Sequence, residues 1–180
     1  GAPTGIGVLY GREELLREIP PILFGGGMVN EVTPAHSSWA EPPSKFEAGT
    51  PNSEGAIGLA AAIRYISSIG MDEIRRIDEN HIKTVLARFA QVPRMRIVGP
   101  HDTAFRSAVV SFTIDGIHPR DLAAMLDQEV IAIRAGHHCA LPLMQWLGVS
   151  ALNRASFWIY NTHEDIEALI KGIQKAIQNN

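Results

Sequence analysis

The stretch "RASFWIYNTHEDIEALIKGIQKAI" (Arg154–Ile177) places a strand-like run directly before an amphipathic helix. Its first seven residues, "RASFWIY", are rich in apolar and aromatic side chains, as buried strands are. Thr162 and Asp165 then form the spacing of a capping box, which marks the start of a helix. Apolar residues follow at helical spacing: Ile166, Leu169, Ile170, Ile173 and Ile177. The stretch therefore predicts a strand followed by a helix that lays one apolar face on a sheet.

The residues upstream of this stretch repeat the same kind of alternation. Three further strand-like runs are "MRIVG" (Met95–Gly99), "AVVSFTI" (Ala108–Ile114) and "EVIAIR" (Glu129–Arg134). Helical patterns stand around them, over Asp72–Gln91, from Pro119 onward, and briefly over Pro142–Leu147. From about residue 68 the order is thus α-β-β-α-β-(short α)-β-α. This order predicts an α+β fold with about four strands in one sheet and helices on one face.

The first 67 residues have a different character. "GIGVLYG" (Gly5–Gly11) is typical of a buried strand, and a short amphipathic helix follows it up to Pro20. Residues 22–53 are rich in Gly, Pro, Ser and Thr, which indicates a long functional loop. The helical run Glu54–Gly70 is apolar nearly all round and is expected to be buried on several sides. We interpret residues 1–67 as the end of a larger domain and residues 68–180 as a domain with its own core.

Composition narrows the classes of protein. Of the 180 residues, 46% are hydrophobic and 19% are charged, which is typical of a globular protein in water. The net charge of −3 gives no attraction to nucleic acid or to an anionic membrane surface. No apolar run approaches the roughly 20 residues that span a bilayer, and no secretory signal is visible. With one cysteine and no internal disulfide, a reducing cytoplasmic location is expected.

That single cysteine, Cys139, lies in "RAGHHCALP" (Arg134–Pro142), just after a predicted strand and a glycine. It could be a small buried residue, a metal ligand or a nucleophile. Three consecutive residues, His-His-Cys, make a poor tetrahedral metal site, because neighbouring side chains diverge. A protease-like arrangement needs a distant histidine, and nothing distinguishes the available ones, which are His81, His101, His118 and His163. A functional loop fits best, since Arg134 would favour the thiolate.

Four stretches together resemble one known family. They are "PTGIGVLYG" (Pro3–Gly11), "FEAGTPN" (Phe46–Asn52), "RAGHHCALPLM" (Arg134–Met144) and "NRASFWIYNTHEDIE" (Asn153–Glu167). In this order they resemble the pyridoxal-phosphate-dependent cysteine desulfurases of the Suf type (group II), which belong to the fold-type I, class V aminotransferases. The resemblance implies that residues 68–180 are the C-terminal small domain of a fold-type I enzyme. Residues 1–67 would then be the C-terminal remnant of its large α/β domain, which binds the cofactor.

The resemblance also implies roles for individual residues. Cys139 corresponds to the catalytic cysteine that carries sulfur as a persulfide. Arg154 corresponds to the arginine that binds the substrate carboxylate, and Arg134 lies beside the active-site loop on the substrate side. Thr50 corresponds to a residue that reaches the phosphate of the cofactor in the neighbouring subunit of a homodimer. No metal is implied.

The residues alone are also compatible with purely structural roles. Arg154 could be a surface arginine at a strand edge, and Thr50 could be a turn residue before Pro51. His137 and His138 could tune the thiol or line a pocket, and neither is assigned a role.

Such enzymes take sulfur from L-cysteine, leave L-alanine, and pass the sulfur to an acceptor protein for iron–sulfur cluster assembly. The lysine that binds pyridoxal phosphate stands upstream of the stretch that begins here at Pro3, and the four lysines present match no cofactor position. We therefore expect the isolated fragment to lack the cofactor and to be inactive. A non-catalytic fragment or interaction module, and a selenocysteine lyase of the same fold, are the alternatives.

Overall fold

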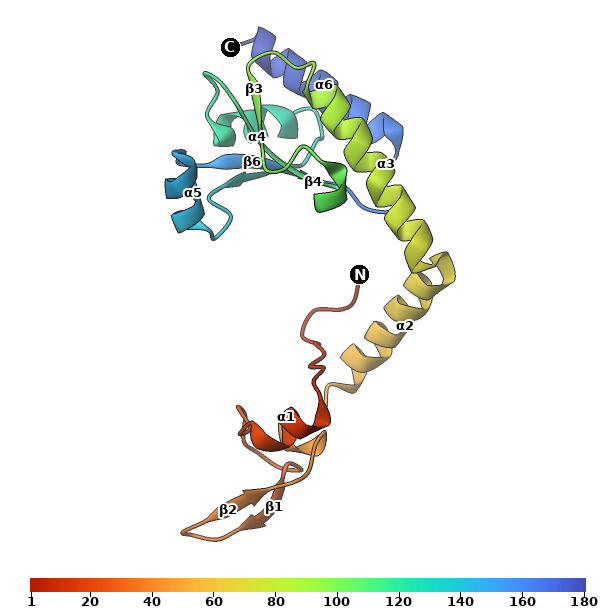
Figure 1. Cartoon of the computed structure of the whole chain (residues 1–180), viewed down its shortest axis with the longest axis vertical. Coiled ribbons are helices and arrows are strands. Elements are labelled where there is room, and N and C mark those ends of the chain that lie inside the picture. The colour runs from red at the N-terminus through yellow and green to blue at the C-terminus, as the bar shows by residue number, and fades with distance from the viewer. The chain divides into compact units, whose positions relative to one another are not determined.

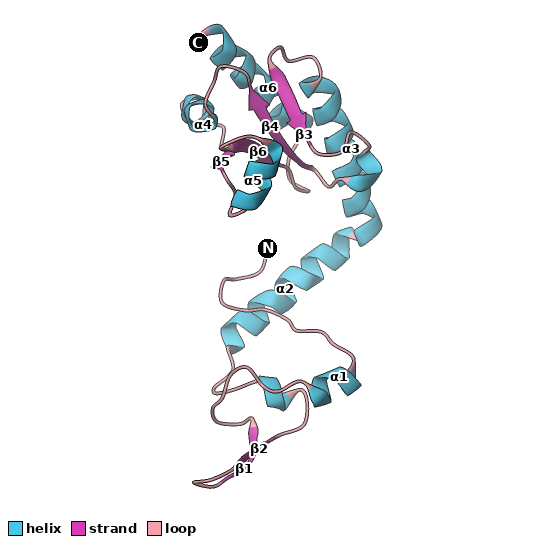
Figure 2. Ribbon diagram, turned by 60° about the vertical axis from the view of Figure 1, so that its left-hand side comes forward, coloured by secondary structure: helices cyan, strands magenta, loops and turns pink.

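A computed structural model describes all residues, Gly1–Asn180, and the chain divides into two compact units (Figures 1 and 2). Unit 1 is Gly1–Ile69 and unit 2 is Gly70–Asn180. We describe each by itself. The assignment of the first residues to a larger cofactor-binding domain stays a prediction. None of the helices combines the length and the apolar character that a membrane-spanning segment needs.

Unit 2 has one four-stranded antiparallel sheet and four α-helices. Its elements are α3 (Met71–Phe89), β3 (Met95–Val98), the 3-10 turn η2 (Thr103–Phe105), β4 (Val109–Ile114), α4 (Pro119–Asp127), β5 (Arg134–Gly136), α5 (Leu141–Leu147), β6 (Leu152–Ser156) and α6 (His163–Gln178). The strand order in the sheet is β3-β4-β6-β5, and every neighbouring pair is antiparallel. The predicted α+β class with a small four-stranded sheet is confirmed.

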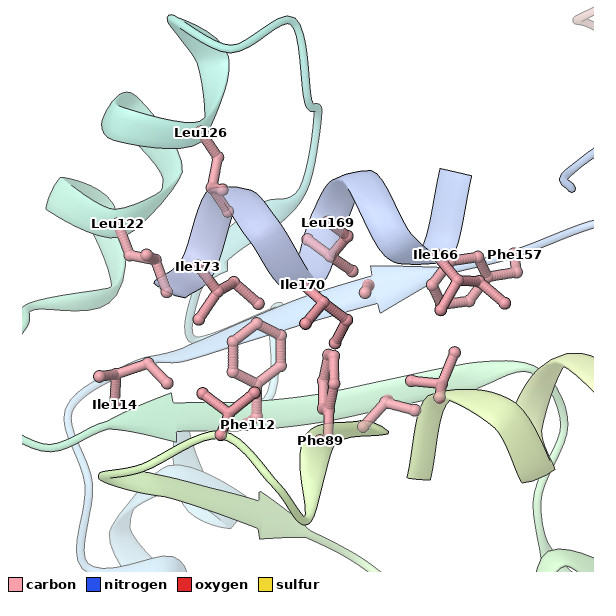
Figure 3. Close-up of a cluster of buried hydrophobic side chains, with 14 of the residues drawn as sticks. Phe89, Phe112, Ile114, Leu122, Leu126, Phe157, Ile166, Leu169, Ile170 and Ile173 are labelled. Carbon is pink, nitrogen blue, oxygen red and sulfur yellow. The ribbon is translucent and has the colours of Figure 1, made fainter. Parts of the chain in front are cut away.

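The core lies between one face of this sheet and the helices α3, α4 and α6. Side chains alternate along β4, so Val110, Phe112 and Ile114 are buried on the helix side. Figure 3 shows helix residues of this cluster converging on Phe112 and Phe89, whose ring centroids lie 4.9 Å apart in an edge-to-face arrangement. Helix α5 contributes no residue to this core.

Helix α6 begins where the sequence predicts. The Thr162 hydroxyl accepts a hydrogen bond from the Asp165 N–H, and the Asp165 carboxylate accepts one from the Thr162 N–H at 2.9 Å. These two bonds form the capping box. The helix then buries six residues: Ile166, Leu169, Ile170, Gly172, Ile173 and Ala176.

Two strands of unit 2 are shorter than the apolar runs that predict them. The run Glu129–Arg134 yields strand pairing only from Arg134, because Val130 adopts φ 60° where the chain turns at the end of α4. The run Arg154–Tyr160 forms a strand from Leu152 to Ser156 and then turns, since the Trp158 N–H donates to the Asn161 side chain.

Unit 1 contains α1 (Glu13–Glu18), a β1–β2 hairpin (Val29–Val32 and Ser37–Trp39), the 3-10 turn η1 (Ser44–Phe46) and α2 (Ser53–Ile69). The hairpin lies in the region predicted to be a loop, and no strand forms over residues 5–11. The expectation that α2 is buried on several sides is wrong for this chain. Only Gly55 of α2 is buried, whereas Ile57 is 70% exposed and Tyr65 is 62% exposed.

Candidate functional site

Two arginines face each other across neighbouring strands of unit 2. Arg134 of β5 is the register partner of Arg154 of β6, and Arg154 is in turn the partner of Ser111 of β4. Phe112 points toward the helices, so its neighbour Ser111 and both arginines lie on the opposite face of the sheet. Like charges directly opposite on antiparallel strands repel each other. A bound anion would remove this repulsion, so the pair favours a negatively charged ligand.

The guanidinium of Arg154 has unused hydrogen-bonding capacity. Its Nε is buried and has no hydrogen-bond partner in the chain. Buried donors are rarely left unpaired, and an unpaired one invites a ligand. A planar guanidinium makes two parallel hydrogen bonds with a carboxylate. The geometry therefore suits Arg154 for binding a carboxylate.

Cys139 lies on the loop that joins β5 to α5. The strand ends at Gly136 with φ 135°, and the Ala140 N–H then donates to the His137 carbonyl at 2.9 Å. His138 and Cys139 both have left-handed backbone conformations, with φ 53° and 58°. Residues other than glycine seldom adopt this conformation, and such strain is often found at functional sites. The thiol is exposed, so its interpretation as a buried packing residue is wrong.

Arg134 brings positive charge to the thiol. Its Nη2 lies 4.0 Å from the Cys139 sulfur, and the Cys139 N–H donates to Nδ1 of His137 at 3.1 Å. A cation at this distance stabilises a negatively charged sulfur. The structure thus brings Cys139, Arg134 and Arg154 together on one side of the sheet, with an exposed thiol beside two arginine side chains.

His138, to which the sequence assigned no role, contacts the neighbouring strand. Its Nε2 lies 3.2 Å from the carbonyl oxygen of Leu152 in β6. Burial lowers its pKa, and the charges of Arg154 and Arg134 lower that pKa further. Leu152 is fourteen residues away in sequence, so no local pattern could have signalled this contact.

Thr50 belongs to unit 1 and is exposed. It follows Gly49, which has φ 84° and whose N–H donates to the Gly26 carbonyl at 2.8 Å. This contact joins the loop of three consecutive glycines, Gly25–Gly27, to the turn that leads into α2. The role of Thr50 toward a phosphate stays a prediction.

The four lysines of the chain do not offer a covalent attachment point for pyridoxal phosphate beside these residues. Lys45 is buried, and its Nζ donates to the carbonyls of Leu16 and Arg17 at 3.2 and 2.6 Å. The other three lie on α3 and α6, the helices that cover the face of the sheet opposite to Arg154: Lys83, Lys171 and Lys175. These residues therefore do not by themselves fit a pyridoxal phosphate aldehyde. No group of three or more His, Cys, Asp or Glu side chains is arranged to hold a metal ion.

The chain is similar in sequence and in structure to cysteine desulfurases. A probable cysteine desulfurase of Halalkalibacterium halodurans is 49% identical over 173 residues, which are 96% of this chain and 42% of that protein. The apo structure of the cysteine desulfurase from Thermococcus onnurineus NA1 matches with a TM-score of 0.94 and 43% identity, over 99% of this chain and 44% of that one. The cysteine desulfurase CsdA (S-sulfonic acid) from Escherichia coli matches with a TM-score of 0.91 and 38% identity over the same shares.

This chain spans less than half the length of each of these proteins. Within that span the match is nearly complete, and the family model described as aminotransferase class-V matches residues 1–169. A single family model thus covers all of unit 1 and most of unit 2. The chain belongs to the aminotransferase class-V family.

Proposed function

We propose that this chain is the C-terminal part of a Suf-type cysteine desulfurase, in which Cys139 receives sulfur from L-cysteine. The observation that carries the proposal is the exposed thiol on a strained loop, 4.0 Å from the Arg134 guanidinium and beside the Arg134–Arg154 pair. A nucleophile beside a carboxylate site is what transfer from an amino acid requires. The three similar proteins described above are named cysteine desulfurases, one of them as probable, and their names support the same substrate class.

The proposed transfer balances without a further reactant. The bond between Cβ and sulfur of L-cysteine breaks, and an S–S bond forms to the Cys139 sulfur. The hydrogen lost from the Cys139 thiol is balanced by the new hydrogen on the methyl group of L-alanine, and the outer sulfur of the persulfide keeps one hydrogen. Arg154 binds the substrate carboxylate. Arg134 stabilises the negative charge on a sulfur atom, either that of the Cys139 thiolate or that of the substrate.

Pyridoxal phosphate supplies the electron sink for this chemistry in the complete enzyme. In the proposed homodimer, Thr50 contributes a hydroxyl to the phosphate of the neighbouring subunit. We infer that the complete protein is cytoplasmic and delivers its sulfur to an acceptor protein for iron–sulfur cluster assembly. Because Lys45 is bound to backbone carbonyls and the other three lysines lie on helices that cover the opposite face of the sheet, the 180-residue chain alone is proposed to be a non-catalytic fragment.

The experiment compares Cys139→Ala and Arg154→Ala in the complete protein. Cys139→Ala should abolish persulfide formation, read by mass spectrometry as loss of one added sulfur atom, while cysteine still binds. Arg154→Ala should weaken cysteine binding by roughly 30- to 150-fold, because it removes a charged two-point contact worth about 2–3 kcal/mol. Persulfide on Cys139→Ala protein, or unchanged cysteine affinity in Arg154→Ala, would show that the role assigned to that residue is wrong.

Two controls separate the alternatives. The same assays are repeated with selenocysteine. Because both amino acids share the carboxylate contact, a much faster reaction with selenocysteine would identify the protein as a selenocysteine lyase. The 180-residue chain with added pyridoxal phosphate should release alanine no faster than free pyridoxal phosphate does. Faster release would contradict the fragment assignment.

A further inference from the structure

The loop that carries Cys139 is tied to β6 by one side chain. Among the hydrogen bonds of residues 137–140, only the contact between His138 Nε2 and the Leu152 carbonyl oxygen, at 3.2 Å, reaches β6. A carbonyl can only accept, so Nε2 must carry the hydrogen. Both the neutral tautomer with its hydrogen on Nε2 and the charged ring can make this bond, so the effect of protonation is decided at the other ring nitrogen.

The second ring nitrogen of His138 makes the charged form unfavourable. Nδ1 is buried and has no partner in the chain. In the neutral ring it is a bare acceptor, whereas protonation would place a buried N–H donor there with nothing to receive it. The added charge would also lie near Arg154, Arg134 and His137.

No carboxylate stands nearby in sequence to offset that charge. The segment from Val130 to Trp158, which contains β5, the Cys139 loop, α5 and β6, has no Asp or Glu. The charged and titratable groups that face His138 are thus Arg154 on β6, Arg134 on β5 and His137 on the loop itself. Burial is the largest cause that lowers the pKa of His138, and the bond to the Leu152 carbonyl opposes it only in part.

The backbone of the loop needs such a restraint. His138 and Cys139 are consecutive residues with left-handed φ, and neither is a glycine. A strained conformation of this kind persists only while surrounding contacts hold it. Loss of the contact between His138 and Leu152 would leave the loop free to relax to ordinary backbone angles.

We propose that His138 is a positioning residue whose neutral side chain clamps the Cys139 loop to β6, and that protonation of His138 releases the loop. The clamp is a feature of this chain's own fold. Its meaning for sulfur transfer rests on the proposed function, because release would move the thiol away from the Arg134–Arg154 pair.

The direction of the pH effect follows from the lowered pKa. The released loop takes up a proton at the ordinary imidazole pKa of about 6.5, and the clamped loop only at a lower pH. The clamp is therefore fully effective above about pH 6.5. Below that pH, the equilibrium between the clamped and the released loop shifts toward release. The shift is at most about tenfold for each pH unit between the His138 pKa of the released loop and that of the clamped loop.

The test measures hydrogen-exchange protection of the Ala140 amide in the 180-residue chain, at about pH 7.5 and about pH 5. This amide reports on the loop because it donates to the His137 carbonyl. In the unmodified chain, protection should fall on acidification, because the released loop binds the proton more readily. His138→Gln keeps an N–H that can donate to Leu152 but does not titrate, so protection should stay high and the fall should disappear. His138→Ala should be poorly protected at both pH values.

Two controls make the outcome decisive. His101→Gln changes an exposed histidine outside the site and should behave as the unmodified chain does. His138→Gln retains His137, so this variant also shows whether pH dependence persists when His138 is absent. Equal protection of the unmodified chain at both pH values, or an unchanged fall in His138→Gln, would overturn the proposal. Hydrogen exchange involves no sulfur chemistry, so this test is independent of the persulfide test. The proposal for His138 can therefore be wrong while Cys139 still carries sulfur, and it can be right while Cys139 does not.

Discussion

Helices α2 and α6 are similar in length but differ in what surrounds them. Helix α6, with 16 residues, gathers its apolar side chains in one stripe and buries six residues against one sheet and its neighbouring helices. Helix α2, with 17 residues, carries apolar side chains nearly all round and buries only Gly55. A one-sided stripe is satisfied by one layer, whereas a helix that is apolar on all sides needs partners on all sides. Unit 2 contains the layer that α6 needs, and unit 1 contains no such partners for α2.

The same difference extends to the units as wholes. Unit 2 has one continuous core, whereas Met28 is the only buried hydrophobic residue of unit 1. Lys45 is also buried in unit 1, where it is held by two backbone carbonyls of α1. Large apolar side chains of unit 1 are exposed instead: Val8, Leu9, Tyr10, Ile22, Leu23, Phe24, Ile57, Ile63 and Tyr65. So large an exposed apolar set marks a surface for interaction with other protein.

The strongest test of this comparison separates the units. A chain of residues 70–180 should fold and unfold cooperatively, because its core lies wholly within it. Residues 1–69 alone should remain largely unfolded, because they bury too little apolar surface to offset the loss of chain entropy. Circular dichroism during urea titration gives the answer. A sharp unfolding transition in the 1–69 chain would break the comparison.

A matched pair of phenylalanines should show the next largest effect. Phe112 is 0% exposed and packs on Phe89 in unit 2, whereas Phe24 is 63% exposed and contacts Trp39 in unit 1. Phe112→Ala should lower the free energy of unfolding by about 3–5 kcal/mol. Phe24→Ala should lower it by about 1 kcal/mol or less, since it loses only an aromatic contact. Urea unfolding of the whole chain, followed by circular dichroism, measures both, and similar losses would contradict the contrast.

Sequence patterns predicted the parts of the fold whose causes are local. The capping box of Thr162 and Asp165 and the stripe of α6 are set within one helix, so their prediction is confirmed. The hairpin of unit 1 was missed because β1 is exposed along its whole length and shows no alternation of apolar residues. The burial expected for α2 was wrong because it depends on partners outside the helix.

The candidate site was only partly predictable for a similar reason. The residues themselves carry recognisable chemistry, and Cys139 and Arg154 could be named from motifs. Their geometry depends on register, which pairs Arg134 with Arg154 across twenty residues of sequence. The contact of His138 with Leu152 follows from the same pairing of β5 with β6, so it too was invisible before the strands were aligned.

The capping box of α6 offers a smaller and pH-dependent test. Thr162→Ala should lower the stability of unit 2 by about 1 kcal/mol, because it removes the acceptor for the Asp165 N–H. The pKa of Asp165 is lowered, chiefly by the Thr162 N–H and then by the Asn161 side chain. Its stabilising effect is therefore present above the ordinary carboxyl pKa and is lost as the pH falls through the lower folded value.

Urea unfolding of unit 2 at neutral and acidic pH measures this dependence. Asp165→Asn retains an acceptor for the Thr162 N–H but cannot titrate, so this pH-dependent contribution should vanish in that variant. An Asp165→Asn protein with the same pH dependence as the unmodified chain would assign the effect to other carboxylates.

The smallest expected effect concerns two helix ends in unit 2 that close in the same way. At the end of α4 the Ile131 N–H donates to the Leu126 carbonyl, and at the end of α5 the Val149 N–H donates to the Met144 carbonyl, both at 3.0 Å. In each, the residue before the donor has left-handed φ. It is Gly148 with φ 70° after α5, but Val130 with φ 60° after α4.

Val130 is 96% exposed, so its side chain adds no packing that would offset this strain. Left-handed φ costs a non-glycine residue about 1–2 kcal/mol. Replacing it with glycine removes this strain but costs about 0.5–1 kcal/mol, because glycine loses more backbone entropy on folding. Val130→Gly should therefore stabilise unit 2 by roughly 0.5–1 kcal/mol, and Gly148→Val should destabilise it by a similar amount. Urea unfolding of both variants measures the pair. If unit 2 is one cooperative domain around a shared core, both changes will shift its single transition, in opposite directions. A shift from neither would mean that these helix ends open separately from the core, and the contrast between a self-contained unit 2 and an incomplete unit 1 would then hold for the core alone.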